Sequence, residues 1–340
     1  MSIPVFRSYI RRKDMDTVLN CLVTDSVGPG EYLDRFQKAA RESLGFDFGF
    51  ALRSPLSALL AALDALALAE GDVVALPALA PAYYAAALRE RRLLPLYLDA
   101  DPDSGAPDFA SIASAAAKPK ALLLFEAQGV LPDPEAVAAL GIPVIEDISQ
   151  SLGAYAGERK AGSLGQLAIL GLEHGGLVTA GGGALLFAQA RRDAAVLRNL
   201  AESLPPELRM TDYNAALGLA QLRELEASIA KRRELAAAFA QSLARTRHRI
   251  LAQAVEGEAG FYSFPVVLDS GMKDVRAYAK KKEVETEAAF EDSLVGRGLV
   301  PEGECPRARS LLMRCLLFPL HQRLGAAGAQ KVSKVLATLP

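Results

Sequence analysis

Polar and turn-forming residues follow four of the strands that the sequence pattern predicts. In a parallel sheet, ligands bind just beyond the carboxyl ends of the strands, so we expect any chemistry at these positions. Carboxylate and amide side chains there could bind a ligand, but they could equally satisfy buried backbone groups. The positions are Ser54, residues 77–81, Gln128 with Gly129, and residues 146–150, which include Glu146, Asp147 and Gln150.

A single histidine, His174, lies in the glycine-rich stretch GLEHGG. Its imidazole could act as a general base near neutral pH. A lone histidine in such a loop is more often structural or solvated, and both interpretations stay open. We expect His248, next to Arg249, at the surface, and His321 in a structural role.

The elements that carry these residues alternate between short apolar strands and helices. Glu31–Leu44 has apolar residues at helical spacing and is followed by Gly45, which predicts a helix that ends there. The alternation predicts an α/β fold with a largely parallel sheet covered on both faces. We expect further helices at residues 56–68, 83–90, 109–117 and 134–140, and strands at residues 48–52, 73–76, 94–98, 121–125 and 143–145.

The pattern changes after residue 165. Expected strands at residues 167–172 and 184–187 flank three consecutive glycines, which a turn explains without a ligand. A helical stretch at residues 211–245 precedes a shorter α/β pattern. We therefore predict a large domain at residues 1–240 and a smaller C-terminal α/β domain at residues 241–340.

Composition and charge argue against several classes of protein. The 340 residues are 51% hydrophobic and 23% charged, and the net charge is -2, so no long-range field favours nucleic acid or an anionic membrane. The apolar runs are too short to cross a bilayer, and the first residues do not resemble a secretory signal. The three cysteines lack the paired spacing of a disulfide framework or a zinc site. We expect a folded, cytoplasmic protein.

Two stretches carry a resemblance to a known family. Residues 142–165 read IPVIEDISQSLGAYAGERKAGSLG, with an E-D-x-x-[HQ] core followed by G-S-L-G, and residues 209–222 read RMTDYNAALGLAQL. Both resemble segments of the DegT-type (DegT/DnrJ/StrS) sugar aminotransferases, in family order. The resemblance implies a fold-type-I pyridoxal-phosphate (PLP) transferase that forms a homodimer with shared active sites. Family members typically transfer an amino group from glutamate to a keto-sugar nucleotide.

The resemblance also assigns roles to individual residues. Asp147 matches the partner of the PLP ring nitrogen, and Gln150 matches the residue that contacts the ring hydroxyl. The phosphate-binding S-G-T turn corresponds to Ser54-Pro55-Leu56. Here the proline removes a backbone donor and the leucine removes a hydroxyl, which should weaken the phosphate site.

Other positions depart further from the family pattern. The Schiff-base lysine falls on Gly176, and the sequence has no lysine between Lys160 and Lys231. The asparagine that the neighbouring subunit supplies to the phosphate is Glu207, whose charge would repel it. The aromatic residue that stacks on the ring is replaced by Pro81, although two tyrosines follow closely in the sequence.

These departures favour one hypothesis and leave another open. We interpret the chain as a degenerate homologue, or pseudoenzyme, without transaminase activity or cofactor, which acts as a binding, regulatory or assembly protein and retains Asp147, Gln150 and Ser54 as vestiges. The alternative is a PLP-dependent keto-sugar aminotransferase or dehydratase of cell-envelope polysaccharide or deoxyaminosugar biosynthesis. Some relatives that dehydrate keto-deoxysugars use a histidine in place of the lysine, so His174 is the candidate base in that case. A sugar nucleotide remains a possible ligand in both.

Overall fold

A mostly parallel sheet forms the centre of the molecule. The computed structural model describes residues 2–253 and 255–340. The strand order is β1-β9-β8-β5-β4-β2-β3, and β9 runs antiparallel to both of its neighbours. The strands are β1 (Phe48–Leu52), β2 (Val73–Pro77), β3 (Leu94–Leu98), β4 (Ala121–Phe125), β5 (Val144–Asp147), β8 (Leu167–Gly171) and β9 (Ala184–Ala188).

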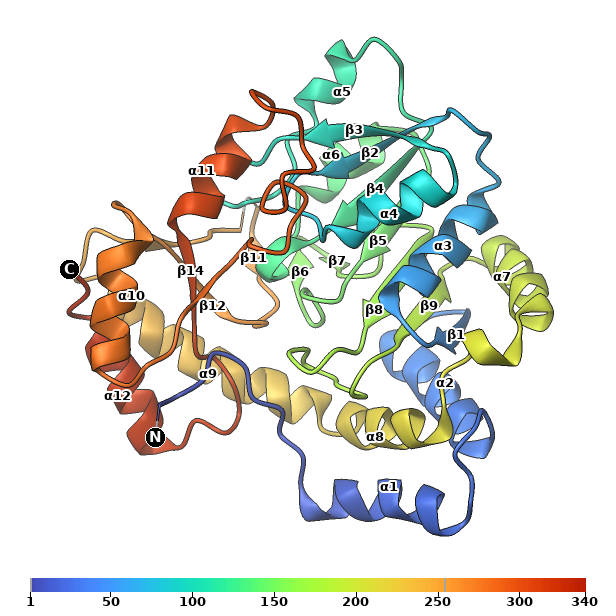
Figure 1. Ribbon diagram of the computed structural model, residues 1–340, viewed down its shortest axis with the longest axis horizontal. Coiled ribbons are helices and arrows are strands. Elements are labelled where there is room, and N and C mark those ends of the chain that lie inside the picture. Colours follow the sequence, from blue (N-terminus) through green and yellow to red (C-terminus); the bar gives the residue numbers. More distant parts are fainter. Residues whose placement is uncertain (1, 254) are drawn as a thin grey trace.

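Helices cover both faces of this sheet because its strands are apolar on both sides (Figure 1). Along β4, Leu123 and Phe125 face one hydrophobic cluster, whereas Leu122 and Leu124 face another. One face packs against α3 (Pro55–Leu66), α4 (Tyr83–Glu90) and α7 (Arg191–Ser203). The other packs against α2 (Glu31–Leu44), α5 (Ala110–Ser114), α6 (Pro134–Ala139) and α8 (Asp212–Leu222), and α1 (Arg12–Val23) lies outside α8.

A smaller antiparallel sheet lies beside this assembly (Figure 1). Its hydrophobic cluster includes the second half of α9 and residues of α10 and α12. The strand order is β10 (Arg249–Ile250), β12 (Phe264–Val267), β14 (Cys315–Phe318) and β13 (Glu287–Ala288), and the helices are α9 (Leu225–Leu243), α10 (Met272–Lys281) and α12 (Ala326–Leu336). A third set of short strands contains β6 (Tyr155–Ala156), β7 (Arg159–Lys160) and β11 (Gly257–Glu258).

The predicted α/β fold class is confirmed. The division at residue 240 stays a prediction, and several contacts cross it. The helix α9 runs through that position, with Ile229 in a cluster of the large sheet and Phe239 in that of the small one. The helix α11 (Pro306–Arg314) packs into the large core, whereas Ile3 pairs with Val284 of the small lobe. In the described residues, no helix has the length and apolar character to cross a membrane.

Candidate active site

A cavity of about 140 Å³ opens at the carboxyl ends of the parallel strands. It lies where the sequence pattern placed the chemistry, and Asp147, Gln150 and Gly176 all line it. His174 is exposed and does not line it, and neither does Ser54. The full lining is Pro55, Pro81, Tyr83, Phe125, Asp147, Ser149, Gln150, Gly171, Glu173, Gly176 and Tyr262.

Asp147, at the end of β5, is the polar centre of this cavity and is only 1% exposed. Its Oδ2 accepts hydrogen bonds from the hydroxyls of Tyr84 at 2.7 Å and Tyr83 at 3.2 Å. Its Oδ1 accepts from the backbone N–H of Ser149 at 3.0 Å and from the Ser149 hydroxyl. Burial raises the pKa of Asp147, and the hydrogen bonds from Ser149, Tyr84 and Tyr83 oppose that rise. All four donors are neutral.

Two further carboxyl groups, Glu146 of β5 and Glu126 directly after β4, are buried but do not line the cavity. Glu146 accepts three backbone N–H bonds, from Gly162 at 2.6 Å and from Leu164 and Gly165 at 2.8 Å each. Glu126 accepts from the Ser151 hydroxyl through Oε2, whereas its Oε1 has no donor among the described residues. Burial, and then the neighbouring Glu146, raise the pKa of Glu126 well above its ordinary value. Burial beside Glu146 therefore favours the neutral form of Glu126.

The turn at the start of α3 uses its own polar groups. The hydroxyl of Ser54 accepts from the backbone N–H of Ser57 at 3.1 Å and lies 2.9 Å from the Ser57 hydroxyl. Pro55 has no N–H to offer. In the described residues, the amide of Leu56 has no hydrogen bond to a protein group. The turn caps its helix but presents little to an anion.

The glycine-rich loop after β8 forms one wall of the cavity and is held by the N-terminal segment. The Ser8 hydroxyl donates to the carbonyl of His174 at 3.0 Å, and the Phe6 ring lies 5.0 Å from the Tyr262 ring. A Cβ added at Gly175 would approach both Phe6 and Tyr262 to 3.3 Å. The loop is therefore packed on both sides close to the cavity mouth.

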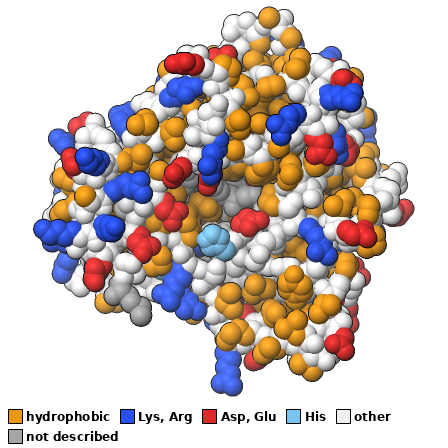
Figure 2. Space-filling model, in the orientation of Figure 1, with side chains coloured by type: hydrophobic (Ala, Val, Ile, Leu, Met, Phe, Trp, Pro, Cys, Tyr) orange, Lys and Arg blue, Asp and Glu red, His pale blue; other side chains and the backbone are white. Residues whose placement is uncertain are grey.

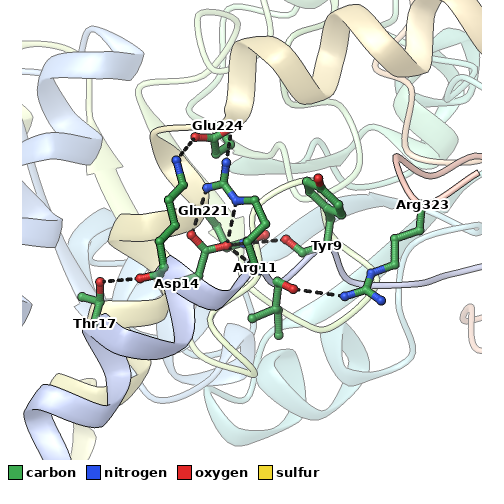
Figure 3. Close-up of polar contacts among 9 residues, drawn as sticks. Tyr9, Arg11, Asp14, Thr17, Gln221, Glu224 and Arg323 are labelled. Carbon is green, nitrogen blue, oxygen red and sulfur yellow. Dashed lines mark hydrogen bonds and ion pairs between the residues drawn. The ribbon is translucent and has the colours of Figure 1, made fainter. Parts of the chain in front are cut away.

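The next part of the N-terminal segment is anchored at both ends (Figure 3). Gln221 donates to the carbonyl of Tyr9 at 3.0 Å, and Arg323 donates to that of Ile10 at 3.0 Å. Arg11 forms ion pairs with Asp14 and Glu224 (Figure 3). The segment thus ties α8 and the C-terminal lobe to the loop beside the cavity.

The remaining predicted residues lie as follows. Gln150 uses its Oε1 to accept from the backbone N–H of Gln128 at 2.7 Å. Glu207 is exposed in the short helix η2 (Pro206–Leu208). The expectation that His248 lies at the surface is wrong, because it is 5% exposed and its ring nitrogens face the carbonyl of Pro340 and the amide of Asp269.

Three residues of the site were not predicted in these roles. The sequence places Tyr83 and Tyr84 near the expected ring-stacking position, yet both bind Asp147. Glu126 directly follows the apolar run of β4. Its position after a strand end was the available signal. Its pairing with Glu146 depends on strand order, which the local pattern does not give.

Comparisons with known proteins agree with this architecture. The chain is 27% identical over 283 residues to GDP-perosamine synthase from Caulobacter vibrioides, and the match covers 77% of this chain and 76% of that one. The fold is similar to that of an aminotransferase from Streptoalloteichus hindustanus, with a TM-score of 0.89, 21% identity, and coverage of 99% of this chain and 98% of the other. It is also similar to the GDP-4-keto-6-deoxy-D-mannose-3-dehydratase of E. coli, with a TM-score of 0.88, 18% identity, and coverage of 99% and 100%.

A family model covers almost the whole chain. It describes the DegT/DnrJ/EryC1/StrS aminotransferase family and matches residues 8–337. The homologues include PLP-dependent sugar aminotransferases and dehydratases. With both sequence motifs inside the matched range and the parallel sheet of the expected fold in place, this chain belongs to the DegT/DnrJ/EryC1/StrS aminotransferase family.

Proposed function

We propose that this chain is a member of its family that neither forms an aldimine with PLP nor transaminates, and that it serves as a cytoplasmic binding, regulatory or assembly protein. The observation that carries the proposal is the cavity wall at Gly176. The sequence resemblance aligns this glycine with the lysine of the family motif, and no lysine lines the cavity among the described residues. An imine requires an amine within reach of the cofactor aldehyde.

The residues that surround the cavity do not fit PLP. A phosphate group would need converging donors at the start of α3. Few are available there, because Pro55 has no N–H and the Ser54 hydroxyl caps the helix. No catalytic step can therefore be assigned to the cofactor in this site.

The position of His174 also supports this proposal over the dehydratase alternative. A general base must come within hydrogen-bond reach of the proton it removes. The His174 side chain is exposed outside the cavity, and its backbone carbonyl is tied to Ser8. A dehydratase that uses this residue would require the loop to be rebuilt.

The test is a visible absorption spectrum of the purified protein after incubation with PLP and removal of excess cofactor. We expect no aldimine band, and no amino-group transfer from glutamate to a keto-sugar nucleotide. An active family member with its lysine, treated in parallel, is the positive control. A yellow protein whose colour shifts on addition of glutamate would contradict the proposal.

Restoring the lost groups gives a second arm of the test. Gly176→Lys alone should give little activity, because the cofactor would still be poorly held. Adding Pro55→Gly, Leu56→Thr and Glu207→Asn should recover PLP binding if the cleft can accept it. Strong transaminase activity from Gly176→Lys alone would contradict the inferred weakness of the phosphate site at the start of α3.

A further inference from the structure

The cavity at the strand ends has an unusual balance of charge. Its described lining contains the carboxyl groups of Asp147 and Glu173 and no lysine, arginine or histidine. Three aromatic residues, Tyr83, Phe125 and Tyr262, supply much of the remaining wall. Figure 2 shows a hollow near the middle of this face, with acidic, basic and histidine side chains around its rim. Such a site repels phosphate and attracts a cation.

Asp147 and the buried Glu146 have no cationic hydrogen-bond partner among the described residues. Asp147 is bound only by hydroxyls and one amide, and Glu146 only by backbone amides and its neighbour Glu126. The buried Arg232 does not serve them, because its guanidinium donates to the carbonyls of Phe261 and Tyr262 at 2.9 and 2.8 Å. A buried carboxylate without a cation is costly, and a ligand cation would offset that cost.

Aromatic walls suit the same kind of ligand. Aromatic rings attract an ammonium group to their faces and also pack against hydrocarbon. The hydroxyl of Tyr83 donates to Asp147, so its oxygen can still accept a hydrogen bond from a ligand N–H. Polar acceptors and aromatic rings therefore line the same cavity.

We propose that this cavity binds a small molecule through a protonated amine, with Asp147 and Tyr83 at its charged end and aromatic rings around its hydrocarbon part. This inference rests on the proposed function, since PLP would occupy the same space. The cavity of about 140 Å³ accommodates a ligand of one ring. Such a cation differs in charge from the sugar nucleotides of the family.

The experiment compares three probes of equal size and different charge. Cyclohexylamine, cyclohexanol and cyclohexanecarboxylate are titrated into the full-length protein at neutral pH, with binding followed by calorimetry and by protein NMR. We expect the amine to bind at least about tenfold more tightly than the alcohol, and the carboxylate not to bind. Inorganic phosphate should not compete with the amine.

Variants of single carboxyl groups identify which of them causes the preference for the amine over the alcohol. Asp147→Asn should bring the amine and the alcohol to similar affinity, and Glu173→Gln should reduce the preference by a smaller factor. Glu135→Gln, an exposed carboxylate of α6 away from the cavity, is the matched control and should change nothing. Thermal unfolding of each variant shows whether it is folded. If Asp147→Asn does not fold, Glu173→Gln tests the proposal.

The relative affinities for the amine and the alcohol decide whether the cavity binds a protonated amine. Equal affinity for the amine and the alcohol in the natural protein, or a preference that neither variant reduces, would overturn the proposal. This failure differs from that of the proposed function, which would appear as a PLP absorption band. A protein that shows no PLP band and no amine preference would keep the first proposal and lose this one.

Discussion

Among individual residues, Tyr84 is the closest tyrosine partner of Asp147. It is 1% exposed, and its hydroxyl donates the shorter of the two tyrosine bonds to Asp147. Burial and then Asp147 raise the pKa of Tyr84 well above its ordinary value, so it stays protonated as a donor. The bond therefore stabilises the carboxylate that the cavity presents.

Tyr84→Phe removes this donor and leaves the ring in place. We expect a loss of about 1 to 2 kcal/mol in the free energy of unfolding, measured by urea denaturation, because a buried oxygen of Asp147 loses its better partner. Tyr278→Phe is the control, since the Tyr278 hydroxyl makes an exposed bond to Thr338 at 2.7 Å. An equal effect of the two substitutions would show that Asp147 does not depend on Tyr84.

Glu126 gives a prediction about pH. Its pKa is raised in the folded protein, so its contribution to stability is full below the unfolded pKa of about 4.3 and is lost as pH rises through the folded value. Over that window the natural protein should lose up to about 1.4 kcal/mol per pH unit from this group. Glu126→Gln should flatten the curve of unfolding free energy against pH, whereas exposed Glu42→Gln should not. An unchanged slope in Glu126→Gln would contradict the assignment.

At the scale of elements, α8 supplies the missing cap of α2. The N-cap residue of α2, Gly30, has no side chain to cap the helix. Asp212 accepts from the backbone N–H groups of Gly30 and Leu33 at 2.9 Å each and of Tyr32 at 3.2 Å. A Cβ at Gly30 would lie 2.8 Å from the Asp212 carboxylate, so glycine is what permits this approach. The negative charge also suits the positive end of the helix.

Asp212→Ala should therefore destabilise the protein by about 2 to 3 kcal/mol, because it leaves several buried amides without an acceptor. Asp212→Asn keeps one acceptor oxygen and should cost less. Asp274→Ala in the first turn of α10, which is exposed, is the control. Hydrogen exchange should show the loss in the first turn of α2. Unchanged protection there would mean that the cap comes from another group.

The helices α2 and α8 show how far the sequence predicts the fold. Helix α2 was predicted with its observed bounds, because its apolar spacing and Gly45 are local signals. Strands β1, β3 and β4 were also predicted with their observed bounds. The cap from Asp212 could not be predicted, because the two residues meet only through packing. Helix α1 was not predicted, since its apolar residues do not face the core.

In the candidate site, too, the sequence predicts what local signals determine and not the contacts between separate elements. The strand ends identified where Asp147 and Gln150 lie, because a parallel sheet fixes that edge. Their present partners depend on contacts between separate elements. Tyr83 and Tyr84 reach Asp147 from α4, and Glu126 meets Glu146 because β4 and β5 are neighbours. Sequence spacing carries no information about such pairs.

At the scale of the whole molecule, apolar side chains gather over α1 and α8 at the lower edge of Figure 2. On α1, four apolar residues recur at helical spacing on the outward face. They are Met15, 48% exposed, Leu19, 52%, Leu22, 50%, and Val23, 80%. A face of this kind on a helix is typical of an interface. Because the family resemblance implies a homodimer and α8 carries one of its two motifs, we expect a second copy of this chain to cover this face.

Sedimentation or light scattering at micromolar concentration should therefore show a dimer. Leu19→Asp with Leu22→Asp should shift the protein to monomer, because a charge at the centre of an apolar interface is desolvated without a partner. Met313→Asp is the matched control, since Met313 is 63% exposed on α11, away from α1. If the interface is correct, only the α1 substitutions change the mass, and both proteins keep the natural protein's circular dichroism spectrum. A natural protein that is monomeric under these conditions would contradict self-association, and a dimer that tolerates both aspartates would place the interface on another face.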